Sequence, residues 1–156
     1  MISYIAAFIL SWSCPESGCP QHFGPNPQAR AEQYAQDIVD GARVHHVDPL
    51  LLAALAAGES DFDPAAVSWR GYSYGAGMFQ LSPRWHDEAF ALCFRTNECV
   101  YWHAREAAGE LASGKRRCGS WIGSVRAYRL GRCSRRYTKQ TWKVINLWRR
   151  LQRGWF

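Results

Sequence analysis

The chain has 156 residues, of which 47% are hydrophobic and 21% are charged, so it suits one globular domain and not a disordered chain. No run of about 18 apolar residues is present, which excludes an ordinary membrane-spanning helix. The formal net charge of +6 is uneven, because residues 1–81 carry a net charge of −5 and residues 82–156 one of +11. Such a basic half predicts a polyanionic partner, either nucleic acid, anionic lipid or an acidic wall polymer.

The first segment, residues 1–10, is short and apolar. It is typical of the hydrophobic stretch of a signal peptide, although no basic residue precedes it and no clear small-residue cleavage site follows. The alternative is that this segment packs on the domain. Residues 14–26 are rich in Cys, Pro and Gly and predict a linker, so we expect residues 1–26 to precede a domain at 27–156.

Six cysteines form an even set, and no C-x-x-C or zinc-finger spacing of histidines accompanies them. Disulfides are therefore expected, with reduced core thiols as the alternative. Six cysteines allow fifteen pairings; the local ones are Cys14–Cys19, Cys93–Cys99 and Cys118–Cys133. Disulfides would place the protein in an oxidising compartment outside the cytoplasm.

Two helix starts follow in chain order, Asn26-Pro27 and Asp48-Pro49, because each combines a capping side chain with Pro at the first helical position. The first helix is expected to end near residue 44. Residues 66–80 mix aromatic and turn-forming residues and predict a short hairpin or loop. Further helices are predicted from Ser82-Pro83 and over residues 95–113, 120–130 and 136–152. The predicted fold class is therefore mainly α, with one small β excursion.

One carboxylate lies on the apolar face of the second helix. Leu51, Leu55 and Glu59 follow one another at four-residue steps, which is about one helical turn. Apolar neighbours favour the neutral carboxyl and raise its pKa, which suits a general acid. In the alternative, the helix ends at Gly58 and Glu59 faces water or caps a neighbouring element.

The residues after this helix carry a resemblance to a known family. Glu59-Ser60 precedes Phe62-Asp63-Pro64, and a Gly-rich stretch leads to Met78-Phe79-Gln80. This pattern resembles the SLT-type lytic transglycosylase catalytic domain of the lysozyme-like superfamily, over about residues 34–150. A third family motif, Ala-Tyr-Asn-x-Gly, is partly matched at residues 127–131. Arg129 stands where the family usually has Asn, and the sequence predicts that this change leaves Glu59 itself untouched.

The resemblance implies an α+β lysozyme-like fold whose hairpin lies beside the catalytic cleft. It also implies roles for single residues. Glu59 would be the catalytic acid and base, Ser60 would place the substrate or orient the acid, and Tyr128 would contact the Glu59 carboxyl. The remaining expected substrate-binding residues are Gln80, Met78, Phe79 and Tyr137.

A second carboxylate, which most glycoside hydrolases use, is not evident in the sequence. Residues 64–86 contain no Asp or Glu. Asp61 should point away from Glu59, and Asp63 before Pro64 predicts an Asx-type turn or a cap at the helix end. The expected reaction is therefore cleavage of the MurNAc–GlcNAc β-1,4 bond by one acid, with formation of 1,6-anhydromuramic ends. A goose-type muramidase and a non-catalytic cationic wall- or membrane-binding protein are the alternatives.

The expected partner is peptidoglycan, and the Arg-rich half is a further candidate surface for anionic wall polymer or membrane. No nucleic-acid module, H-E-x-x-H motif or nucleotide fingerprint is present, so no nucleic acid, metal or cofactor is expected. The predicted location is extracytoplasmic, either secreted, in the envelope or anchored by the N-terminal segment.

Overall fold

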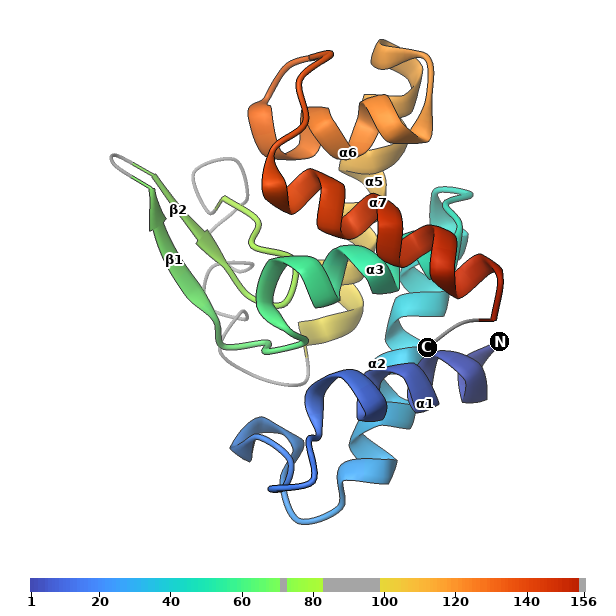
Figure 1. The fold of residues 1–156 in the computed structure, drawn as a ribbon, viewed down its shortest axis with the longest axis vertical. Coiled ribbons are helices and arrows are strands. Elements are labelled where there is room, and N and C mark those ends of the chain that lie inside the picture. Colours follow the sequence, from blue (N-terminus) through green and yellow to red (C-terminus); the bar gives the residue numbers. More distant parts are fainter. Residues whose placement is uncertain (71–72, 83–98, 155–156) are drawn as a thin grey trace.

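A computed structural model describes residues 1–70, 73–82 and 99–154. Their helices are α1 (Ile2–Ser13), η1 (Gln21–Phe23), α2 (Pro27–Val44), α3 (Pro49–Ser60), α5 (Val100–Cys118), α6 (Trp121–Leu130) and α7 (Lys139–Gln152). Two strands, β1 (Val67–Arg70) and β2 (Ser73–Ala76), form an antiparallel hairpin to one side of the helices (Figure 1). The predicted fold class is confirmed: the chain is mainly helical with a small hairpin, as expected of a lysozyme-like domain.

The helix starts follow the capping rules. The Asn26 side chain accepts a hydrogen bond from Ala29 N, and the Asp48 side chain accepts one from Leu50 N at 2.9 Å. Both predicted starts are therefore confirmed, since each side chain satisfies an amide that the helix leaves unpaired. The helix predicted from Ser82-Pro83 lies outside the described residues.

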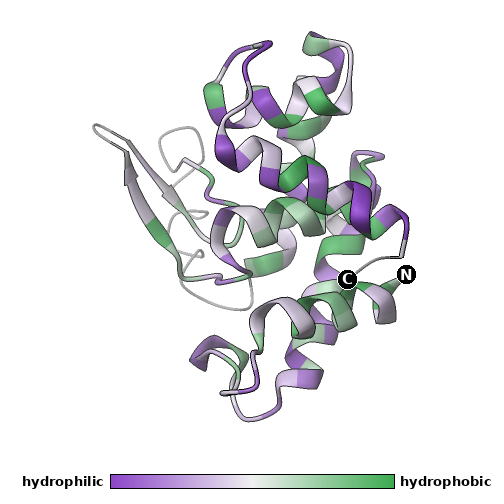
Figure 2. Cartoon of the chain, viewed as in Figure 1, coloured by the Kyte–Doolittle hydropathy of each residue, from purple (hydrophilic) through white to green (hydrophobic). Residues whose placement is uncertain are grey.

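The core surrounds α3, whose residues from Leu51 to Gly58 are all buried. Helix α7 packs across α3, while α2 packs against α1 and α5, and α5 packs against α6 (Figure 1). The buried residues of α7 include Val144, Ile145, Leu147 and Leu151, and hydrophobic and hydrophilic residues alternate along the helix (Figure 2). This arrangement holds the last turn of α3 between the hairpin and the end of α6.

The N-terminal apolar segment forms α1 and packs on the domain, with Ile5, Phe8 and Ile9 buried. The Tyr4 hydroxyl donates to Leu151 O at 2.7 Å, which joins α1 to the end of α7. A role of this segment in export or anchoring stays a prediction. None of the described helices combines the length and apolarity needed to cross a bilayer.

Two of the predicted disulfides are present, Cys14–Cys19 and Cys118–Cys133. The second closes a ring of chain that contains α6, since Cys118 ends α5 and Cys133 follows α6. The predicted pairing of Cys93 lies outside the described residues.

Candidate active site

Glu59 is the penultimate residue of α3, and its side chain is only 1% exposed. The helix continues to Ser60 and stops there because Asp61 and Phe62 adopt left-handed backbone conformations, with φ of 54° and 64°. The helix therefore does not end at Gly58, and the alternative in which Glu59 faces water is wrong. The carboxyl group lies where the periodicity predicted it, at the buried end of the helix.

Arg129, in the last turn of α6, forms an ion pair with this carboxylate. Its Nε lies 2.9 Å from Glu59 Oε1, and its side chain is 18% exposed. The expectation that the Asn-to-Arg departure leaves Glu59 untouched is therefore wrong. Carboxylates are almost never buried unpaired, so the sequence called for a partner of Glu59, but this rule does not identify Arg129 as that partner. A guanidinium at this distance favours the ionised carboxylate and opposes the effect of burial.

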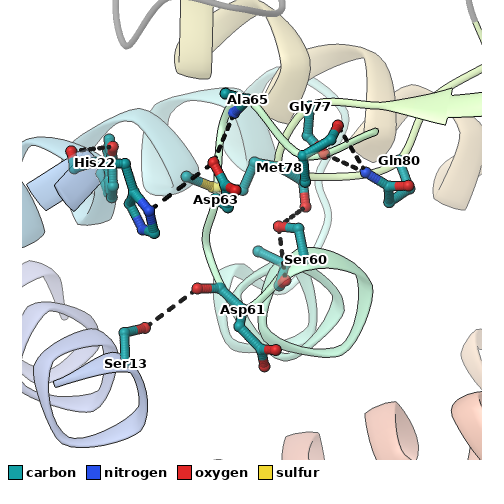
Figure 3. A network of polar contacts seen from close by, with 12 residues as sticks. Ser13, His22, Ser60, Asp61, Asp63, Ala65, Gly77, Met78 and Gln80 are labelled. Atoms are coloured by element: carbon teal, nitrogen blue, oxygen red, sulfur yellow. Dashed lines mark hydrogen bonds and ion pairs between the residues drawn. The ribbon is translucent and has the colours of Figure 1, made fainter. Parts of the chain in front are cut away.

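Two hydroxyl groups hold the turn at residues 77–80, and the contact of Ser60 with Met78 is visible in Figure 3. The Ser60 hydroxyl donates to Met78 O at 2.7 Å, and the Tyr128 hydroxyl donates to Phe79 O at 2.8 Å. The side chains of Met78 and Phe79 are themselves fully buried in the core. Ser60 and Tyr128 thus fix the position of this turn relative to α3 and α6.

The Gln80 side chain forms hydrogen bonds at the base of the hairpin, and its bond to Gly77 is visible in Figure 3. Its side-chain amide donates to Ala66 O at 3.1 Å and to Gly77 O at 3.0 Å, and its carbonyl accepts a hydrogen bond from the Ser68 hydroxyl. These contacts satisfy both ends of the amide. A role of Gln80 in sugar binding stays a prediction, as do those of Met78 and Phe79.

Tyr137 lies on the chain between α6 and α7 and is 49% exposed. The guanidinium carbon of Arg126 lies 3.8 Å from the centre of its ring, a cation–π contact that orients the ring. An exposed aromatic ring held in this way can stack on a sugar, which is consistent with its expected role but does not test it.

The two other carboxylates near the end of α3, Asp61 and Asp63, contact groups other than Glu59. Asp61 is 68% exposed at its side chain, accepts a hydrogen bond from Trp12 Nε1 at 2.9 Å, and lies 3.7 Å from Lys143 Nζ. Asp63 accepts a hydrogen bond from Ala65 N at 2.8 Å (Figure 3), so the predicted Asx-type turn is confirmed. Asp63 also lies 3.9 Å from His22 Nδ1. Burial lowers the pKa of His22, and the nearby Asp63 carboxylate only partly opposes this effect.

A buried histidine that the sequence did not single out lies beneath the turn. His103 of α5 is fully buried, and its ring packs directly against Gly77. Its neighbours in sequence gave no signal for this position, because the contact joins segments that are far apart in the chain. The His103 ring therefore packs against the same turn that the hydroxyl groups of Ser60 and Tyr128 hold by hydrogen bonds.

Comparison with known families identifies the family of this chain. The family model described as Transglycosylase SLT domain matches residues 38–144, which is more than half of the chain. The match covers α3, the hairpin and α6, and so includes Glu59 and each of the predicted substrate-binding residues. No curated protein and no solved structure gave a match.

Proposed function

Because the chain belongs to the transglycosylase SLT domain family, whose members act on peptidoglycan outside the cytoplasm, we propose that it is a lytic transglycosylase whose catalytic acid is Glu59. The bond cleaved would be the β-1,4 linkage from MurNAc to GlcNAc, and the products would carry 1,6-anhydromuramic ends. The observation that carries this proposal is a single buried carboxylate at the end of α3, beside a hairpin without acidic residues.

The first step needs a proton on Glu59. The carboxyl group gives this proton to the glycosidic oxygen as the bond to the anomeric carbon breaks, and GlcNAc leaves with a free 4-hydroxyl. Positive charge develops at the anomeric carbon of MurNAc. Burial of Glu59 supports this step, because an apolar surrounding favours the neutral acid.

The second step uses the same group as a base. The Glu59 carboxylate removes the proton of the MurNAc C6 hydroxyl, whose oxygen attacks the anomeric carbon and closes the 1,6-anhydro ring. The attacking group belongs to the substrate, so its effective concentration is high and no second carboxylate is required to activate water. The contacts of Asp61 with Trp12 and Lys143, and of Asp63 with Ala65, agree with a one-acid mechanism.

Arg129 bears on both steps. Its guanidinium favours the ionised Glu59, which suits the base of the second step and opposes the protonated acid of the first. Catalysis therefore requires that the ion pair weaken when substrate binds. Arg129 is in this proposal a positioning residue that acts on the proton of Glu59.

The product distinguishes a transglycosylase from a hydrolase. Purified peptidoglycan is digested with the wild type, with Glu59→Gln and with Glu32→Gln, and the fragments are analysed by mass spectrometry. Glu32 is a matched control, because it is an exposed glutamate on α2. We expect anhydromuramic ends from the wild type and Glu32→Gln, and a loss of at least about 100-fold in Glu59→Gln. Reducing ends alone would identify a goose-type muramidase, and equal digestion by Glu59→Gln would remove Glu59 from the mechanism.

A second candidate function is a non-catalytic, cationic wall- or membrane-binding protein. The observation that favours it is the ion pair between Arg129 and Glu59, which holds the acid in its charged form. This function predicts binding and envelope damage that are equal in the wild type and in Glu59→Gln, and that are lost at high salt. The same preparations test it, by leakage from anionic liposomes and by sedimentation with cell walls.

A further inference from the structure

A groove of about 980 Å³ runs between the end of α1, the end of α6 and one side of α7. Two tryptophans contribute to its walls, Trp12 from α1 and Trp142 from α7, and Trp142 is 59% exposed. Four cationic side chains line the groove: Arg129, Lys139, Lys143 and Arg150. The described residues of the lining include no acidic residue. The groove is therefore both basic and partly apolar.

Two of these four cations, Arg129 and Lys143, have acidic partners among the described residues. Lys143 lies 3.7 Å from Asp61, but both side chains are well exposed, and such pairs contribute little. Neither Lys139 nor Arg150 has a salt bridge within the part of the chain that the structure describes. An anion that enters the groove thus meets Lys139, Lys143 and Arg150 without the cost of breaking a strong pair. Only its contact with Arg129 competes with the buried Glu59 carboxylate.

Arg129 joins this groove to the candidate catalytic acid. Its side chain lines the groove, and its Nε lies 2.9 Å from the Glu59 carboxylate. A ligand in the groove can therefore contact the same Arg129 side chain that pairs with Glu59, the proposed catalytic acid. An anionic ligand would compete with Glu59 for the guanidinium.

We propose that this groove binds the carboxylates of the stem peptide carried by the muramic acid at the cleaved bond. The proposal rests on the proposed function, because it takes peptidoglycan as the substrate. Each peptide-bearing MurNAc carries its peptide on the lactyl group of the same sugar ring that Glu59 would act on, so the peptide leaves the site close to Glu59. Its carboxylates match the cations of the groove, and its aliphatic side chains match Trp12 and Trp142.

The binding of this carboxylate also meets the requirement that the ion pair weaken. As the peptide carboxylate draws Arg129 away, the balance at Glu59 moves towards the protonated acid. The groove would then link recognition of an anionic substrate to the first step of the reaction. A membrane surface fits less well, because these cations line a hollow and not a protruding face.

The test compares two double variants with the same loss of charge. Lys139→Gln with Arg150→Gln removes two cations of the groove, and Arg116→Gln with Arg117→Gln removes two exposed cations at the end of α5. Each is assayed on peptidoglycan strands with intact stem peptides, on strands with amidated peptide carboxylates, and on strands stripped of peptides by an amidase. We expect the groove variant to raise KM about 5-fold or more on the intact strands alone, with kcat within about 2-fold.

Several outcomes would overturn the proposal. It fails if the wild type cleaves intact and amidated strands with the same KM, if both double variants raise KM equally, or if the groove variant loses only binding to anionic vesicles. The first result leaves the proposed function standing. Calorimetric titration of Glu59→Gln with a muramyl peptide and with its amidated form tests the groove without catalysis. Binding of the acidic form alone, weakened by the groove substitutions and not by the control, supports the proposal even if no cleavage is observed, and equal binding of both forms refutes it.

Discussion

Replacement of Arg129 by Asn, the residue that the family usually has at this position, is expected to move the pH dependence of catalysis upward. The guanidinium favours the ionised Glu59, so the free enzyme keeps its catalytic proton only at lower pH. Without Arg129, Glu59 would hold this proton to higher pH. The limb at which kcat/KM falls with rising pH should therefore shift to higher pH, because this parameter reports the free enzyme.

The size of the shift follows from the geometry. Two unit charges about 4 Å apart attract by about 4 kcal/mol at an effective dielectric constant of about 20, which corresponds to about 3 pH units. The Arg129 side chain is 18% exposed, so solvent reduces this attraction. We therefore expect a shift of about 1–2 pH units. The exposed pair of Asp61 and Lys143 at the same end of α3 is unchanged in the variant.

The assay measures release of soluble fragments from peptidoglycan between about pH 4 and pH 9, a range that covers carboxyl groups with raised pKa values. Arg132→Asn is the matched control, because Arg132 is exposed beyond the end of α6 and loses the same charge. Its profile should move by less than about 0.3 pH units, since solvent and salt screen an exposed charge. A profile of Arg129→Asn that overlays the wild type, or that moves to lower pH, would show that the ion pair does not control the proton of Glu59.

Three further predictions concern stability, measured by unfolding in urea. Gly77 has φ of 73° and packs on the His103 ring. The substitution Gly77→Ala should therefore lower the free energy of unfolding by about 2–3 kcal/mol. Replacing Cys118 and Cys133 by Ser opens a loop with a sequence separation of 15, which should cost about 3 kcal/mol. Burial raises the pKa of Asp37 to about 6. The folded state then binds this proton more tightly than the unfolded chain, so stability falls as the pH rises from about 4 to about 6. As the pH rises from about 4 to about 7, the free energy of unfolding of Asp37→Asn should therefore increase by about 1–2 kcal/mol relative to that of the wild type.

Matched variants control these predictions. Gly119→Ala keeps the positive φ but meets open space, so it should lose only about 1 kcal/mol. Opening the Cys14–Cys19 disulfide, with a separation of 5, should cost about 2 kcal/mol and so less than the longer loop. Equal losses of stability in the two glycine variants, or on opening the two disulfides, would contradict the reasoning. So would a difference in stability between Asp37→Asn and the wild type that does not change with pH.

Features that depend on neighbouring residues were predictable from the sequence. Asn26 and Asp48 act as caps because their side chains reach amides only two or three residues away. The spacing that placed Glu59 on the apolar face of its helix is equally local. The Asx-type turn at Asp63 follows the same rule, since its acceptor and donor are two residues apart.

Features that depend on packing between distant segments were not predictable in this way. The helix predicted to end at residue 113 continues to Cys118, with Gly114 inside it. A side chain at Gly114 would come within 2.7 Å of the Ser124 hydroxyl, so glycine here allows α6 to approach and does not end the helix. The pairing of Arg129 with Glu59 joins residues of two helices in the same manner.

The ring closed by Cys118 and Cys133 has a consequence for when the site is completed. It encloses α6, the helix that supplies both Arg129 and Tyr128, whereas α3 with Glu59 lies outside it. If this disulfide is reduced the ring is open, and the contacts left to hold α6 are its packing against α5 and the hydrogen bond from Ser124 to Leu111 O. Glu59 is therefore positioned by folding alone, whereas Arg129 is positioned by folding and by the disulfide that encloses α6. A newly made chain would hold this pair less firmly before it reaches an oxidising compartment than after.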